Sequence, residues 1–345
     1  MKILFVIGSW QAVVGLAAIR SASRGQNDLS LVVFVQRGNE RDMFQTCEAF
    51  FRNIGVETIL LRFREFTEGK IPNSVSKAIR RASEVYFPFT SNFLNFTGWP
   101  DLVYEKINFY EDGLHSVSLL ERLFSRLEKD ASRSWFDRLK LALRDFPNRN
   151  ASRTKNVDLK IRNLSDFHQF WGILPYGIQY HSLQDVDILF LKESLQIFSK
   201  LEPCSGRDRI IPGTVILGSN FAMFGMLSAD REYDLIIRFI ESSRDQETIY
   251  WKPHPRASWL YTEYLLGKCP EVRLWPVKNS SIPFECHIEE QPDLRIVSIM
   301  STSLAYAKIL YQRDVRMLGD ISELLAERGQ ELLPSYNYLR SMVGR

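Results

Sequence analysis

The chain has 345 residues, of which 45% are hydrophobic and 25% are charged, with a formal net charge of +3. This composition is typical of a globular protein, the length favours two domains, and so small a charge does not by itself indicate a nucleic-acid-binding protein. Four scattered cysteines with no CxxC pair argue against a disulfide framework or a structural zinc site, and they fit a reducing compartment. No stretch is long and apolar enough to span a bilayer, so we expect a cytoplasmic protein whose membrane contact, if any, is peripheral.

Apolar runs and helical patterns alternate along the first half of the sequence, which indicates βαβ units and a parallel sheet. Short apolar runs predict strands at residues 3–7, 29–36, 56–63, 84–87, 107–110 and 186–191. Apolar residues at helical spacing predict helices at residues 12–23, 42–54 and 75–82. Gly55 suits the C-terminal cap of the second of these helices.

A polar, turn-rich stretch at residues 202–209 predicts a linker, which divides the chain into domains 1–205 and 206–345. The alternation then restarts. Strands are predicted at residues 214–217, 248–251, 272–275, 294–299 and 315–318, and helices at 229–242, 262–266, 304–311, 323–329 and 336–343. A further capped helix is predicted to start within residues 281–285, with Pro283 near its first position. Two α/β domains of this kind make a cleft between two sheets.

Residues 251–256, with the sequence WKPHPR, directly follow a predicted strand. Each proline fixes its own φ and pushes the residue before it to an extended conformation. Lys252 and His254 therefore lie on a stiff, non-helical segment past a strand end, where open α/β sheets bind ligands. With Arg256, these side chains suit an anionic ligand, above all a phosphate. The alternative is an ordinary solvated turn.

The strand predicted at residues 107–110 runs straight into Glu111, Asp112 and Gly113. Two carboxylates at a strand end can place a general base in a cleft, because like charge and partial burial raise the pKa of one carboxylate toward a useful range. The alternative is a plain turn, since Asp-Gly is a strong turn signal.

A second feature typical of a phosphate-binding site is the run Ser301, Thr302 and Ser303, which lies between a predicted strand and a predicted helix. A helix N-terminus offers free N–H groups and a partial positive charge, and the hydroxyls add donors. The alternative is simple N-capping, for which one hydroxyl suffices. The sequence has no Walker loop, and no GxGxxG follows the first strand, so a dinucleotide-binding fold of the usual kind is not expected.

Residues 121–160 hold 11 Lys or Arg against 6 Asp or Glu, a local surplus of +5. Trp135, Phe136, Leu139 and Leu143 recur within this stretch at helical spacing. One interpretation is a basic, amphipathic surface for an anionic membrane or an anionic polymer. The other, which we favour, is a solvated helix that packs its apolar stripe on the core.

The remaining histidines predict no metal site, because His115, His168, His181 and His287 show no ligand spacing with Cys or acidic residues. His287 is close in sequence to Glu285, Glu289 and Glu290. We expect residues 285–290 to form a solvated, charged helix face rather than a metal cluster.

Three motifs in this order resemble those of the bacterial two-domain sialyltransferases, namely the lipooligosaccharide sialyltransferases and the capsular polysialyltransferases. The motifs are Glu111-Asp112-Gly113, Lys252-Pro253-His254-Pro255-Arg256 and Ser301-Thr302-Ser303. The resemblance implies a GT-B fold, in which two Rossmann-like α/β domains face a cleft, the first on the acceptor side and the second binding the nucleotide sugar.

The same resemblance implies an inverting, metal-independent transfer of sialic acid from CMP-sialic acid to a hydroxyl of a glycan. Such a reaction serves the biosynthesis of a polysaccharide at the bacterial cell surface. The implied partners are a CMP-sugar donor and a lipooligosaccharide or capsule-type acceptor, with no cofactor and no nucleic acid.

The resemblance also assigns residues to roles. Asp112 matches the general base that deprotonates the acceptor hydroxyl, and His254 matches the acid that contacts the CMP phosphate. Ser301, Thr302 and Ser303 match phosphate-binding hydroxyls. The other residues expected to bind substrate are Glu285 at the ribose, Ser9 and Gln11 near the acceptor sugar, and Glu111, Gly113, Gly218, Lys252, Pro255 and Arg256.

Two other functions stay open on the sequence. A related transferase could use another CMP- or UDP-activated sugar, because the motifs do not separate these donors. A non-catalytic module could hold a glycan without turnover. The acceptor, the linkage and the number of sugars added are not fixed by the sequence.

Overall fold

The computed structural model of the chain describes residues 1–36, 41–67, 70–90, 107–114, 116–117, 119–120, 169–175, 183–201, 212–219, 221–222, 225–243, 247–255, 257–276, 281–321, 325 and 327–344. The described residues up to 201 are called the first half below, and those from 212 onward the second half. The predicted linker at 202–209, the basic stretch at 121–160 and Arg256 lie outside the described residues. The position of the domain boundary therefore stays a prediction.

The described strands of the first half form one parallel sheet with the order β3-β2-β1-β4-β5-β6-β7. They are β1 (Lys2–Val6), β2 (Leu29–Gln36), β3 (Glu57–Arg62), β4 (Glu84–Pro88), β5 (Ile107–Tyr110), β6 (Gln169–Gly172) and β7 (Leu183–Asp185). In the centre of the sheet, Ile3 pairs with Leu31 on one side and Val85 on the other. All five residues of β1 are buried, which explains its continuous apolar sequence.

The helices of the first half are α1 (Ser9–Ala22), α2 (Arg41–Asn53), α3 (Phe63–Thr67), α4 (Asn73–Arg81) and α8 (Ile188–Ser199). Helix α1 packs on β1, β4 and β5 and is covered by α8. The predicted cap of α2 is confirmed, because Gly55 has a φ of +76° and its N–H donates to the carbonyl of Arg52 at 3.0 Å.

The strand predicted at residues 186–191 is wrong, because these residues enter a helix. Asp187 is the N-cap of α8, and its Oδ1 accepts the N–H of Leu189 at 2.8 Å. Leu191, Leu195 and Phe198 then form a buried stripe at helical spacing. The strand of this region, β7, ends at Asp185.

The described strands of the second half form a parallel sheet with the order β10-β9-β8-β11-β12. They are β8 (Gly213–Leu217), β9 (Thr248–Lys252), β10 (Arg273–Leu274), β11 (Leu294–Ser298) and β12 (Val315–Met317). The helices are α9 (Ala229–Ser243), α10 (Trp259–Lys268), α11 (Glu285–Ile288), α12 (Thr302–Tyr311) and α13 (Leu333–Val343), with a 3₁₀ helix at Glu327–Leu332.

Two helix predictions in the second half need correction, one in its start and one in its type. Helix α11 begins at Glu285 with Phe284 as its N-cap, so Pro283 precedes the cap instead of occupying the first turn. Near the C-terminus, the 3₁₀ helix at 327–332 stands where an α-helix is predicted at 323–329.

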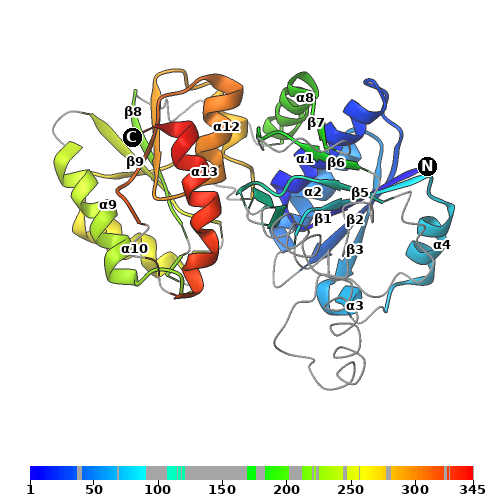
Figure 1. Cartoon of the computed structure of the whole chain (residues 1–345), viewed down its shortest axis with the longest axis horizontal. Helices are drawn as coiled ribbons and strands as arrows, with labels where there is room; N and C mark the ends of the chain where they lie inside the picture. Colours follow the sequence, from blue (N-terminus) through cyan, green and yellow to red (C-terminus); the bar gives the residue numbers. More distant parts are fainter. Residues whose placement is uncertain are drawn as a thin grey trace, which may run out of the picture.

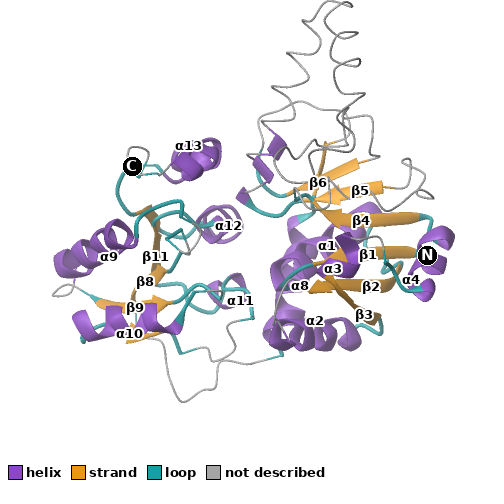
Figure 2. Ribbon diagram, turned by 90° about the horizontal axis from the view of Figure 1, so that it is seen from below, coloured by secondary structure: helices purple, strands orange, loops and turns teal. Residues whose placement is uncertain are grey.

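Helices α12 and α13 join the two halves. Figure 1 and Figure 2 show α12 between the second sheet and the first half, with α13 beside it and α9 on the far side. Buried Leu304 and Tyr306 of α12 and Leu339 of α13 belong to the same apolar cluster as the residues of β1 and α1. The predicted class of two Rossmann-like α/β domains facing each other is therefore confirmed, with α12 at the contact.

The N-cap of α8 gives a stability prediction. Asp187→Ala removes the acceptor for the Leu189 N–H, so we expect the free energy of unfolding to fall by about 1 kcal/mol. The measurement is urea unfolding followed by circular dichroism. Asp185→Ala, which removes an exposed carboxylate at the end of β7, is the control. Equal unfolding midpoints for the two variants would contradict the cap.

Candidate active site

A cleft of about 380 Å³ lies between the two halves. It is at the carboxyl ends of both parallel sheets, close to the points where their strand orders reverse, which is where open α/β sheets bind ligands. The predicted site residues that line it are Ser9, Gln11, Asp112, Gly113, Gly218, Lys252, His254, Pro255, Glu285, Ser301, Thr302 and Ser303. Residues chosen from separate stretches of the sequence thus share one cavity.

Asp112 follows β5 and lines the cleft from the first half. Its backbone N–H donates to Ser116 Oγ at 2.8 Å. Gln11 Nε2, in the first turn of α1, donates to Asp112 Oδ1. The resemblance places Gln11 near the acceptor sugar, and the structure adds a second role, because this bond orients the predicted base.

Glu111 is fully buried behind the wall of the cleft. Its Oε2 accepts the backbone N–H groups of Ile173 at 2.7 Å and Leu174 at 2.9 Å, and its Oε1 accepts the hydroxyl of Tyr306. These donors make the burial of the carboxylate tolerable. The position does not fit the predicted direct contact with substrate, because the carboxylate is used in the contact between the halves.

Gly113 has a φ of +69°, a left-handed conformation that glycine adopts without strain. A Cβ at this position would lie 2.7 Å from both Cγ2 and Oγ1 of Thr302, a residue of the second half. Thr302 Oγ1 accepts the N–H of Leu114 at 3.2 Å. Gly113 is therefore needed both for the turn after β5 and for the close approach of the two halves.

The three hydroxyls at the start of α12 have three different partners. Ser301 is the N-cap, and its Oγ accepts the N–H of Ser303 at 3.2 Å, so the capping interpretation is confirmed for this residue. Thr302 reaches Leu114 of the first half, and the Ser303 side chain hydrogen-bonds Glu285. The positive end of the α12 dipole faces the cleft, because residues 301–303 line it.

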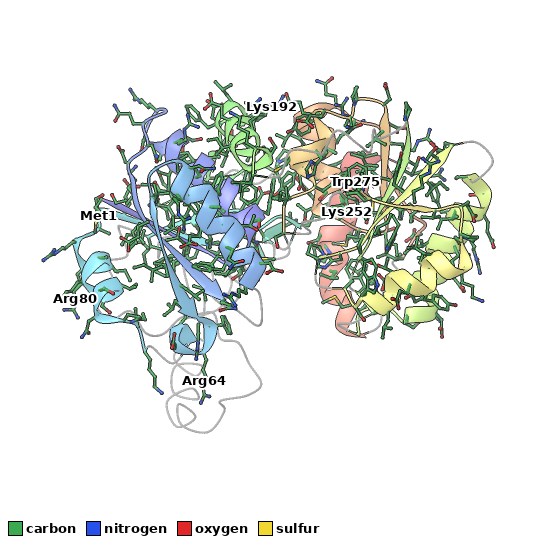
Figure 3. The ribbon with its side chains drawn as sticks, turned by 180° about the vertical axis from the view of Figure 1, so that it is seen from behind. Met1, Arg64, Arg80, Lys192, Lys252 and Trp275 are labelled. Atoms are coloured by element: carbon green, nitrogen blue, oxygen red, sulfur yellow. The ribbon has the colours of Figure 1, made fainter. Side chains whose placement is uncertain are left out.

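Lys252 at the end of β9 and Glu285 at the start of α11 are charged groups that line the second-half wall of the cleft. Burial lowers the pKa of Lys252, and the neighbouring Glu285 opposes that shift. Burial raises the pKa of Glu285, and the Ser303 hydrogen bond and Lys252 oppose it. Figure 3 shows Lys252 on the side of the second sheet that faces the first half.

His287 corrects the prediction of a solvated face at residues 285–290. Its side chain and that of Glu285 are buried, because α11 packs against α8 and α12. Burial and the charge of Lys252 lower the pKa of His287 to about 4, so the imidazole is neutral at pH 7. Only Glu289 and Glu290 of this group are exposed.

His254 lies on the loop after β9, opposite the end of β8. Its carbonyl accepts the N–H of Ala257 at 2.9 Å, and the N–H of Gly218 donates to the Lys252 carbonyl at 2.8 Å. A Cβ on Gly218 would lie 3.0 Å from the backbone nitrogen of His254 and 2.9 Å from the Trp251 ring. The small residue at position 218 therefore lets the two loops lie side by side at the cleft.

Some residues that line the cleft lie outside the motifs recognised in the sequence. They are Trp10, Met43, Phe221, Phe284 and Tyr306, together with several residues of their loops. The rings of Trp10 and Tyr306 lie 4.3 Å apart between centroids, and Trp10 Nε1 donates to the Tyr306 hydroxyl at 3.3 Å. The one sequence signal for Tyr306 is its place one helical turn after Thr302.

The described residues contain neither a metal cluster nor a membrane-spanning helix. Across the ranges given above, no group of three or more His, Cys, Asp or Glu side chains is arranged to hold a metal ion. Within the same ranges, no helix has the length and the hydropathy to cross a membrane.

A family model described as alpha-2,8-polysialyltransferase (POLYST) matches residues 2–317. No curated protein matches the sequence. The solved UDP-GlcNAc 2-epimerase from Neisseria meningitidis bound to UDP-GlcNAc is similar in structure, with a TM-score of 0.55 and 11% identity over 100% of this chain and 94% of that one. For the enzyme from Methanocaldococcus jannaschii in complex with UDP-GlcNAc and UDP, the values are 0.52 and 13%, over 100% and 93%. These likenesses show the GT-B fold.

The approach of the halves at Gly113 is testable. Gly113→Ala and Gly55→Ala both place a side chain at a positive φ, which costs about 1–2 kcal/mol of stability. At Gly55 a Cβ meets nothing within 4 Å, whereas at Gly113 it meets Thr302. We expect Gly113→Ala to lower both stability and nucleotide-sugar turnover, and Gly55→Ala to lower stability alone.

The measurements are thermal unfolding and the rate at which a nucleotide sugar is consumed. If Gly113→Ala and Gly55→Ala have the same activity, then the contact between Gly113 and Thr302 does not shape the site.

Proposed function

Because the chain belongs to the alpha-2,8-polysialyltransferase family of glycosyltransferases, we propose that it transfers sialic acid from CMP-sialic acid to a hydroxyl of a glycan acceptor. The reaction proceeds with inversion at the anomeric carbon and without a metal ion. Membership of the family implies a nucleotide-sugar donor and a glycan acceptor. The finer assignments of donor and stereochemistry rest on the resemblance of the three motifs, and metal independence is supported by the hydroxyl and N–H groups of the cleft.

One observation carries the proposal. A single cleft brings a carboxylate from the first half, Asp112, to the same cavity as imidazole and hydroxyl groups from the second half, including His254 and Thr302. The volume of about 380 Å³ falls in the usual range for small-molecule sites, roughly 300–1,000 Å³. A single inverting displacement of a phosphate from a sugar places these two kinds of group on opposite sides of one carbon.

On the acceptor side, Asp112 takes the proton from the attacking hydroxyl. Gln11 holds one oxygen of the Asp112 carboxylate, which fixes the direction in which the other oxygen points. Ser9 and Trp10, from the same turn, line this side of the cleft and contact the acceptor sugar. A positioned base of this kind typically contributes about 10²–10⁴-fold to the rate.

On the donor side, the transition state separates a cationic sugar from an anionic phosphate. His254, the hydroxyls at residues 301–303 and the N–H groups at the start of α12 surround the place where that charge develops. His254 donates a proton or a hydrogen bond to the leaving phosphate. These groups supply the phosphate with positive charge and hydrogen-bond donors, which supports transfer without a metal ion. Glu285 binds the ribose hydroxyls.

We further propose a cytoplasmic location. Of the two interpretations of residues 121–160, which lie outside the described residues, the basic amphipathic surface would add peripheral contact at the inner membrane, whereas the packed helix favoured above would not. A donor other than CMP-sialic acid, such as another CMP- or UDP-activated sugar, is the alternative that the nucleotide experiment below distinguishes.

Nucleotide preference tests the donor. We expect CMP to bind more tightly than UMP or GMP, and to bind in EDTA because protein groups hold the phosphate. Isothermal titration calorimetry with the three nucleotides in a chelating buffer measures both properties. Preference for UMP would favour the UDP-sugar alternative, and binding only after magnesium is added would contradict metal independence.

The base and acid assignments are tested together. Asp112→Asn keeps the size of the side chain but cannot take a proton, so kcat should fall roughly 10²–10⁴-fold with CMP affinity nearly unchanged. His254→Ala should lower both kcat and CMP affinity, because it contacts the leaving group in the ground state and in the transition state. The assay follows transfer from CMP-sialic acid to an oligosaccharide that ends in sialic acid.

Asp185→Asn, at an exposed carboxylate on the end of β7, is the matched control and should keep full activity. NMR of the first-formed product reads the anomeric configuration. A retained configuration, or full activity of Asp112→Asn, would rule out a single displacement with Asp112 as base.

A further inference from the structure

The loop that carries Asp112 belongs to the first half, yet the second half holds it at three points. The Tyr306 hydroxyl donates to Glu111, Thr302 Oγ1 accepts the N–H of Leu114 at 3.2 Å, and Ser335 Oγ donates to the carbonyl of Leu114 at 2.5 Å. Asp112 therefore lies between two anchored positions. Its placement depends on α12 and α13 as well as on its own sheet.

Helix α12 also provides the donor side of the cleft. Thr302 uses its oxygen as an acceptor for Leu114, which leaves the hydroxyl proton able to reach a phosphate oxygen, since a hydroxyl both donates and accepts. Tyr306 stands one turn further along the same helix. One rigid element thus contacts the phosphate position at its start and the base-carrying loop one turn later.

The polar contact around Tyr306 is buried and continuous. Trp10 Nε1 donates to the Tyr306 hydroxyl at 3.3 Å, the hydroxyl donates to Glu111 Oε1, and Glu111 Oε2 accepts two backbone N–H groups at the end of β6. Tyr306 itself is fully buried. Removing the hydroxyl leaves the Trp10 donor and the Glu111 oxygen without this bridge, although the ring still packs on Trp10.

Resting on the proposed function, we propose that Tyr306 is a positioning residue that acts through Asp112. Its hydrogen bond to Glu111 ties the base-carrying loop at residues 111–114 to the donor-binding start of α12. The base is aligned with the sugar only while the two halves stay in this contact. The same contact between the halves then sets both the position of the sugar donor and the position of the base.

Tyr306→Phe tests this assignment, because it removes the hydroxyl and keeps the ring. A small misplacement of a reacting group can slow an enzyme up to about 100-fold, so we expect kcat to fall about 10- to 100-fold with the donor KM within about twofold. In an Asp112→Asn background, Tyr306→Phe should lower kcat no further, because the base through which it acts is already gone.

Two further variants make the test specific. Tyr336→Phe removes another buried tyrosine hydroxyl, one that bonds Asp320 Oδ1 at 3.2 Å within the second half, and should leave kcat unchanged. Glu111→Gln weakens the same bridge from the other side and should repeat the effect of Tyr306→Phe. Circular dichroism establishes that each variant is folded.

The outcomes separate the two proposals. Full activity of Tyr306→Phe, or a loss of the same size in the presence and absence of Asp112, overturns the positioning role while the base assignment stands. Full activity of Asp112→Asn overturns the base assignment and, with it, the role proposed for Tyr306. Non-additive losses in the double variant support the link.

Discussion

The contact between α12 and the loop after β5 is the constraint on which the cleft depends. Two parallel sheets with their carboxyl ends facing each other define a cavity only if their separation is fixed. Buried Glu111 and Tyr306 and partly buried Trp10 fix it with a chain of hydrogen bonds that crosses between the halves. A polar network that is fully satisfied at one geometry disfavours others, because sliding the halves apart leaves buried groups without partners. Apolar packing alone would fix the separation between the two halves less strictly.

The electrostatics of the cleft follow from the same burial. Enclosure by both halves lowers the pKa of Lys252 and raises that of Glu285, so burial opposes the charged form of each group. An anionic donor favours charged Lys252. Because its pKa is raised, Glu285 takes up its negative charge less readily than an exposed carboxyl group would.

The sheets could be predicted from the sequence because their central strands are buried on both faces. The run at Leu29–Gln36 is apolar over nearly its whole length, and its observed bounds equal the predicted ones. The same reasoning failed at residues 186–191, since a short apolar run is compatible with a strand or a buried helix. The cap, Asp187, lies inside that window, but the helical spacing of Leu191, Leu195 and Phe198 becomes visible only beyond it. Strand β6 was not predicted, because only Phe170 and Trp171 of its four residues are apolar.

The composition of the site was predictable, because topology alone brings strand ends to one edge. The partners of its residues were not: Tyr306 and Glu111 are 195 positions apart, and their contact depends on how two separately folded sheets dock. One local rule would have corrected the assignment of Glu111. Successive side chains of an extended segment point to opposite sides, so only one of two adjacent acids after β5 can face the cavity. Asp112 faces the cleft, and Glu111 consequently points into the contact between the halves, where its charge requires the donors that it finds there.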